Sequence, residues 1–77
     1  MLCVDTWLGS HRVLWGNPEY RKQLLLRNGF PMQYFQFLAN VVHSQQQDAI
    51  FPLPMTSYSA TNILGESELR FDLVYID

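Results

Sequence analysis

The sequence predicts an α/β fold in which three short parallel strands, at about residues 2–5, 49–53 and 71–76, alternate with helices. Short runs of apolar, β-branched and aromatic residues fit strands that are buried on both faces. Helix signals and apolar residues at spacings of three and four fill the segment between the first two runs. Strands that alternate with helices form a parallel sheet through right-handed crossovers, which gives the fold class.

The first and last strand runs share one pattern. Each is apolar and ends in an acid, Asp5 in MLCVD and Asp77 in FDLVYID, whereas Asp72 is expected to be a turn residue. Because the carboxyl ends of parallel strands meet at one edge of a sheet, both terminal acids are candidate site residues. The middle run, AIFPLP, contains two prolines that remove ladder donors, which predicts an edge strand or a short strand that ends at Phe51.

Capping signals bound the first helix at about residues 18–27. Asn17 can accept a hydrogen bond from the first turn, and Pro18 has no N–H to leave unpaired there. Arg27 in the last turn and a following Asn28-Gly29 pair predict the end of this helix.

A second helix is expected at about residues 32–46, and a short third one at about 60–64. The second follows Pro31 and carries an apolar stripe at Phe35, Leu38, Val41 and Val42, widened by Tyr34 and Phe37. Gln45, Gln46 and Gln47 would form its polar end. Ser59 is expected to cap the third helix and Gly65 to end it.

Composition restricts the function classes. The chain has 77 residues, 48% of them hydrophobic, and a net charge of −2, which argues against a nucleic-acid or anionic-membrane partner. It has one cysteine, Cys3, expected to be a small buried hydrophobe in a reducing compartment. No apolar run approaches the ~18 residues of a membrane span, and the N-terminus lacks signal-peptide features, so we expect a soluble, cytoplasmic protein.

The candidate chemistry centres on Asp5. A carboxylate at this place can accept bidentate, charge-assisted hydrogen bonds from the 2′- and 3′-hydroxyls of a ribose. The alternative is an ordinary loop-capping aspartate, and it applies to Asp77 as well. The four glycines are scattered and form no phosphate cradle, and Asp5, Ser10 and His11 lie too close in sequence to predict a catalytic triad.

Several segments together resemble the class I S-adenosylmethionine-dependent methyltransferases. They are VDTWLGS, NGFPMQYFQFLANVV, the proline-rich strand, the serine-containing loop after it, and FDLVYID. The resemblance covers nearly the whole chain, from the second to the fourth strand of that Rossmann-like fold. It implies S-adenosyl-L-methionine as the cofactor and O-methyl transfer to a small-molecule acceptor in the complete enzyme.

The resemblance assigns roles to individual residues. It places Asp5 on the ribose of the methyl donor and a loop beside the adenine, which gives as cofactor-binding residues Asp5, Thr6, Trp7, Tyr58 and Ser59. Asp77 matches a ligand of a divalent cation such as Mg²⁺ in metal-dependent O-methyltransferases. Such a cation would bind two adjacent substrate oxygens.

The resemblance also implies that the Gly-rich first strand and the acceptor site lie outside these residues. We therefore expect residues 1–77 to form a single partial domain, a fragment or a truncated gene product, with no catalytic residue and no activity of its own. Its strand edges would pair with each other, stay open or be covered by another copy, so self-association is expected.

Two other functions remain open. A fragment of a nicotinamide-dependent Rossmann oxidoreductase would share the acid after its second strand, although two helices here separate strands that one helix usually connects. A non-enzymatic α/β interaction module would use Trp7, Trp15 and the Phe35 stripe as a partner surface. An exposed apolar patch on an otherwise complete fold would support such a module.

Overall fold

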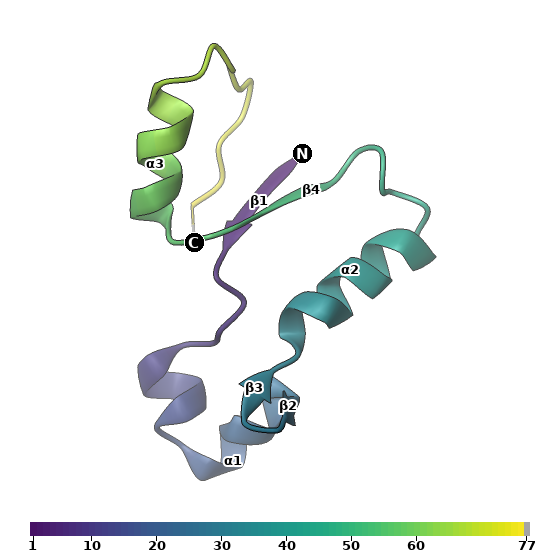
Figure 1. Cartoon of the computed structure of the whole chain (residues 1–77), viewed down its shortest axis with the longest axis vertical. Coiled ribbons are helices and arrows are strands. Elements are labelled where there is room, and N and C mark those ends of the chain that lie inside the picture. The colour runs from purple at the N-terminus through teal and green to yellow at the C-terminus, as the bar shows by residue number, and fades with distance from the viewer. Residues whose placement is uncertain (77) are drawn as a thin grey trace.

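The computed structural model describes residues 1–76 apart from the side chains of His11 and Arg12, so Asp77 lies outside the described residues. The elements in chain order are β1 (Leu2–Asp5), a π-helical turn (His11–Trp15), α1 (Pro18–Arg21), a 3₁₀ turn (Lys22–Leu24), β2 (Leu26–Arg27), β3 (Phe30–Pro31), α2 (Gln33–His43), β4 (Phe51–Pro54) and α3 (Ser57–Gly65) (Figure 1). The chain is a small α/β protein, as predicted. It has one parallel strand pair and one separate antiparallel pair.

The parallel pair joins β1 to β4, with Leu2 opposite Phe51 and Asp5 opposite Pro54. This pairing confirms that the first two predicted strands lie parallel in one sheet, and the second of them begins at Phe51, two residues later than predicted. The long segment between them forms the lower part of the molecule in Figure 1, and α3 lies beside the sheet at the other end.

The prolines of β4 occupy the positions that face away from β1. The N–H of Phe51 donates to the carbonyl of Met1 at 2.8 Å, so Phe51 directs its donor toward β1. Donors alternate along a strand, which places the donor of Leu53 on the same side and Pro52 and Pro54 on the outer side. No ladder donor is lost, and the edge-strand alternative of the prediction is correct.

The third predicted strand, residues 71–76, is absent. These residues form neither helix nor strand, and their backbone makes no hydrogen bond to the described residues. Leu73, Tyr75 and Ile76 are each more than 85% exposed. A strand needs a neighbour to satisfy its backbone groups, and high strand propensity alone does not supply one.

The first helix begins as predicted and ends earlier. The Oδ1 atom of Asn17 accepts the N–H of Glu19 at 3.0 Å, which confirms the cap. The α-helix ends at Arg21, and a 3₁₀ turn carries the chain on to Leu24. Leu25 then adopts φ 55°, a left-handed conformation that ends the helical path, so the predicted end at residue 27 is wrong.

The Asn28-Gly29 pair forms a hairpin turn, not the end of a helix. It joins β2 to β3, which pair antiparallel, with Arg27 opposite Phe30. Asn28 and Gly29 have φ values of 53° and 80°. Two successive positive φ values define the tight hairpin turn for which Asn-Gly is the preferred sequence.

α2 ends at His43, three residues before its predicted end. Gln45 has φ 57°, and its N–H donates to the carbonyl of Val42 at 2.9 Å, while the N–H of Gln46 donates to Val41 at 3.0 Å. These two bonds are the Schellman pattern that satisfies the last carbonyls of a helix. The glutamines therefore lie in and beyond a C-terminal cap and do not extend the helix.

Because a non-glycine residue in this conformation costs roughly 1–2 kcal/mol, we expect Gln45→Gly to stabilise the chain by a net ~0.5–1 kcal/mol. Chemical denaturation followed by far-UV circular dichroism measures the change. Gln36→Gly, in the middle of α2, is the matched control and should destabilise by about 1 kcal/mol. Equal effects of the two changes would contradict the cap.

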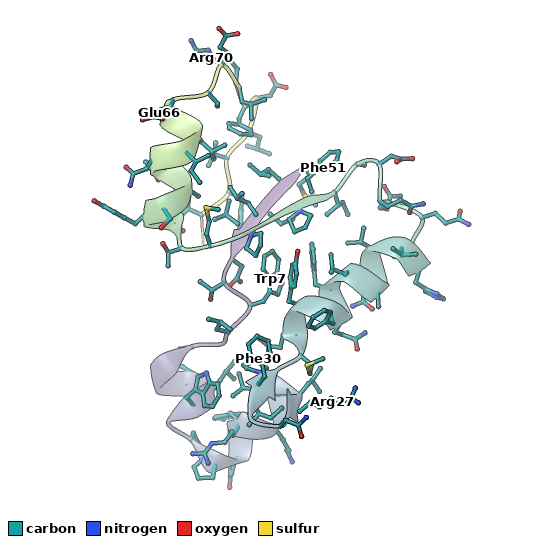
Figure 2. All side chains as sticks on the ribbon, viewed as in Figure 1. Trp7, Arg27, Phe30, Phe51, Glu66 and Arg70 are labelled. Atoms are coloured by element: carbon teal, nitrogen blue, oxygen red, sulfur yellow. The ribbon has the colours of Figure 1, made fainter. Side chains whose placement is uncertain are left out.

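The buried face of α2 differs from the predicted stripe. Val41 is buried and Leu38 is partly buried, as predicted, but Phe35 and Val42 are exposed. Tyr34 and Phe37 take the inward places because the ring of Trp7 stacks against them, with centroid distances of 5.0 and 4.8 Å. Figure 2 shows Trp7 between the sheet and α2.

The chain leaves much apolar surface uncovered. Its radius of gyration is 14.4 Å, whereas a compact domain of this length has about 11.5 Å. Leu24 is the largest fully buried side chain among the described residues. The fold therefore leaves apolar surface available for contacts with further polypeptide.

Candidate functional site

A polar hollow of about 280 Å³ opens at the carboxyl ends of β1 and β4. The residues that line it come from both strand ends and from the start of α3: Val4, Asp5, Thr6, Met55, Thr56 and Ser57. Parallel pairing with Asp5 opposite Pro54 brings the two strand ends to the same edge. This is the edge at which open α/β sheets bind ligands.

Asp5 uses one carboxylate oxygen in a hydrogen bond within the chain. Its Oδ1 atom accepts the backbone N–H of Trp7 at 2.9 Å, and none of the described groups, which leave out the side chains of His11 and Arg12, donates to Oδ2. The hydrogen bond from Trp7 to Oδ1 is the loop-capping contact that the sequence analysis gives as the alternative to ligand binding. The two roles are compatible, because the capped carboxylate still presents an acceptor.

Trp7 points away from this hollow. Its φ of 55° turns the chain directly after Thr6, and its ring packs on Tyr34 and Phe37 of α2. Thr6 stays in the lining, where its Oγ1 atom accepts the N–H of Leu8 at 3.3 Å. Of these two predicted neighbours of Asp5, the structure brings Thr6 to the hollow and directs Trp7 into side-chain packing.

α3 begins earlier than predicted, and its cap is Thr56 instead of Ser59. The Oγ1 atom of Thr56 accepts the N–H of Ser59 at 3.2 Å and donates to its Oγ at 3.1 Å. Thr56 and Ser57 therefore line the hollow, whereas Ser59 faces the cap and Tyr58 is 81% exposed. Thr56, a favoured N-cap residue two positions after the end of β4, was the sequence signal for this start.

The polar side chains of the hollow suit a ligand that carries hydroxyl groups. One carboxylate and three hydroxyl groups, from Thr6, Thr56 and Ser57, surround the hollow. The described side chains, which exclude that of His11, hold no cluster of three acidic, histidine or cysteine groups that could bind a metal ion. The predicted cation ligand Asp77 is outside the described residues. The lining therefore offers hydrogen bonds to sugar hydroxyls through side chains that are already held at the strand ends.

A second, apolar hollow of about 360 Å³ lies at the other end of the strands. Its lining residues are Met1, Leu2, Phe51, Leu69 and Phe71, none of which has a charged side chain. The hollow therefore has no polar side chain to orient a ligand.

Comparison with protein-family models, with curated proteins and with solved structures found no match. Within residues 1–76, no helix has the length and apolar character needed to cross a bilayer.

Proposed function

We propose that the chain is the donor-binding part of a class I S-adenosylmethionine-dependent methyltransferase, in which Asp5 holds the ribose of the donor. The observation that carries this proposal is the placement of Asp5 at the carboxyl end of a parallel strand pair, in a hollow lined by hydroxyl-bearing residues, with an Oδ2 atom to which no described group donates. In the complete enzyme, the methyl group would pass to an oxygen of a small-molecule acceptor.

The part of the chemistry that belongs to this chain is binding. The 2′- and 3′-hydroxyls of a ribose donate to a carboxylate, and hydrogen bonds to a charged group contribute roughly 1.5–3 kcal/mol. Thr56 and Ser57 lie across the hollow from Asp5 and add hydroxyls that can bind the rest of the nucleoside. We expect weak binding and no methyl transfer by the 77 residues alone, since no group in the hollow can act on an acceptor.

The test is a titration of the ¹⁵N-labelled chain with S-adenosylhomocysteine, followed by amide chemical shifts. We expect the largest shifts at Asp5, Thr6 and Ser57. Adenosine should shift the same amides, and 2′,3′-dideoxyadenosine should bind at least ~10-fold more weakly, because it lacks both donors to the carboxylate. Equal binding of the two nucleosides, or shifts confined to other residues, would refute the proposal.

The same titration distinguishes the nicotinamide-dependent oxidoreductase from the methyltransferase. A nicotinamide dinucleotide also carries an adenosine ribose, so it would reach Asp5 as well. Tighter binding of the dinucleotide than of S-adenosylhomocysteine would favour the oxidoreductase over the methyltransferase. The chain has no Gly-rich turn for the pyrophosphate, so we expect the opposite order.

A further inference from the structure

The two outer edges of the parallel sheet differ in their capacity to accept another strand. Pro52 and Pro54 face outward on β4 and offer no donor there. Backbone groups alternate in direction along β1 in the same way. Those of Cys3 face β4, and those of Leu2 and Val4 face outward. The outer edge of β1 has neither proline nor charge between Leu2 and Val4, so it lacks the usual protection against strand addition.

An apolar hollow lies beside the start of this edge and is lined by Met1, Leu2, Phe51, Leu69 and Phe71. Exposed apolar residues 73–76 follow the hollow along the chain, and Arg70 and Asp72 are the charged residues of the segment 69–76. Aromatic side chains such as those of Phe51, Phe71 and Tyr75 bury roughly 150–250 Å² each when they are fully covered. The exposed members of this surface therefore supply roughly the 800 Å² per partner that a stable interface buries.

We propose that this surface is covered by a second copy of the chain, which pairs antiparallel with β1 across a twofold axis at Cys3. Leu2 of each copy then lies opposite Val4 of the other, and both outward-facing residues of each strand exchange hydrogen bonds. A twofold interface requires a self-complementary patch, and this register provides one. The sheet would have the order β4-β1-β1-β4 and would end there, because prolines block both outer edges.

This interface adjoins the proposed donor site at Val4, which also lines the polar hollow. The dimer is tested by sedimentation and cysteine linkage without a ligand, and the donor site by titration with a nucleoside. Either proposal can therefore fail while the other stands.

The register makes a specific prediction about Cys3, a free and partly buried thiol. In this arrangement the two Cys3 residues form a directly opposed pair without hydrogen bonds, with Cα atoms about 4.5 Å apart, within the range that a disulfide spans. We expect mild oxidation with diamide to link the 77-residue chain into a covalent dimer. In the double variant Cys3→Ser, Leu2→Cys the new thiol lies opposite Val4, and linkage should be at least tenfold slower.

Sedimentation of the reduced chain tests the assembly directly, with an expected mass of twice 9.0 kDa. Val4→Pro removes an outward donor without removing a bond between β1 and β4, and should weaken dimerisation at least ~10-fold, while Val4→Thr keeps the donor and the dimer. Circular dichroism checks that both variants fold. Should Val4→Pro unfold, the cysteine comparison decides alone. A monomer at millimolar concentration, or equal linkage of both cysteine positions, would overturn the proposal.

Discussion

Asp5→Asn should weaken the binding of S-adenosylhomocysteine by about 10- to 100-fold, because it replaces charge-assisted hydrogen bonds with neutral ones or loses them. The substitution is chosen because an asparagine Oδ1 atom can still accept the N–H of Trp7. The turn after β1 is therefore retained while the charge is removed. Amide shifts in the titration described above give the ratio of dissociation constants.

Asp48→Asn is the matched control for this change. It removes the same charge from a turn that does not line the polar hollow, so affinity should remain within about twofold. Equal weakening by both variants would mean that overall charge, not contact with Asp5, governs binding. Unchanged affinity in Asp5→Asn would refute the assignment of the ribose to this carboxylate.

Gly9→Ala should lower the free energy of unfolding by ~2–4 kcal/mol, of the ~4–12 kcal/mol expected for 77 residues. Gly9 has φ 86°, and a Cβ atom added there would collide with the Cδ2 atom of the fully buried Leu24. Conformational strain and overpacking act together, because the backbone and the Leu24 side chain would both have to move. Urea denaturation followed by tryptophan fluorescence measures the loss.

Substitutions at two other glycines distinguish the cost of conformational strain from the cost of overpacking. Gly29 also has a positive φ, 80°, but an added Cβ would meet nothing within 4 Å. Gly29→Ala should therefore cost only about 1–2 kcal/mol, the conformational part. Gly65→Ala, at the end of α3 in open space, should stabilise by up to ~1 kcal/mol. Equal losses for Gly9→Ala and Gly29→Ala would contradict the close contact with Leu24.

Local signals predicted the elements whose causes are local. The Asn17 cap, the start of α2 and the apolar run of β1 depend on neighbouring residues, and each forms. The Asn28-Gly29 pair fits both a helix end and a hairpin turn, and the antiparallel pairing of residues 26–31 decided between them. Residues 71–76 have strand composition but no paired neighbour, and no local pattern reveals whether a neighbour exists.

The candidate site was predicted in part for the same reason. Asp5 and Thr6 could be placed because strand ends in a parallel sheet share an edge. Thr56 and Ser57 were missed because the start of α3 was assigned to Ser59. The direction of Trp7 could not be predicted, since it follows from the position of α2, an element far along the chain.

The hydrogen bond between Asp5 and Trp7 links the polar hollow to a fluorescent side chain. The carboxylate holds the backbone of Trp7, whose indole ring lies against Tyr34 and Phe37. A ligand that shifts the Asp5 carboxylate would also shift Trp7 and change the quenching of Trp7 fluorescence. Ligand binding in the hollow could then be followed by tryptophan fluorescence without a label. Trp15, whose Nε1–H donates to the carbonyl of Leu8 at 2.7 Å, is the second fluorescent residue and would be removed by substitution.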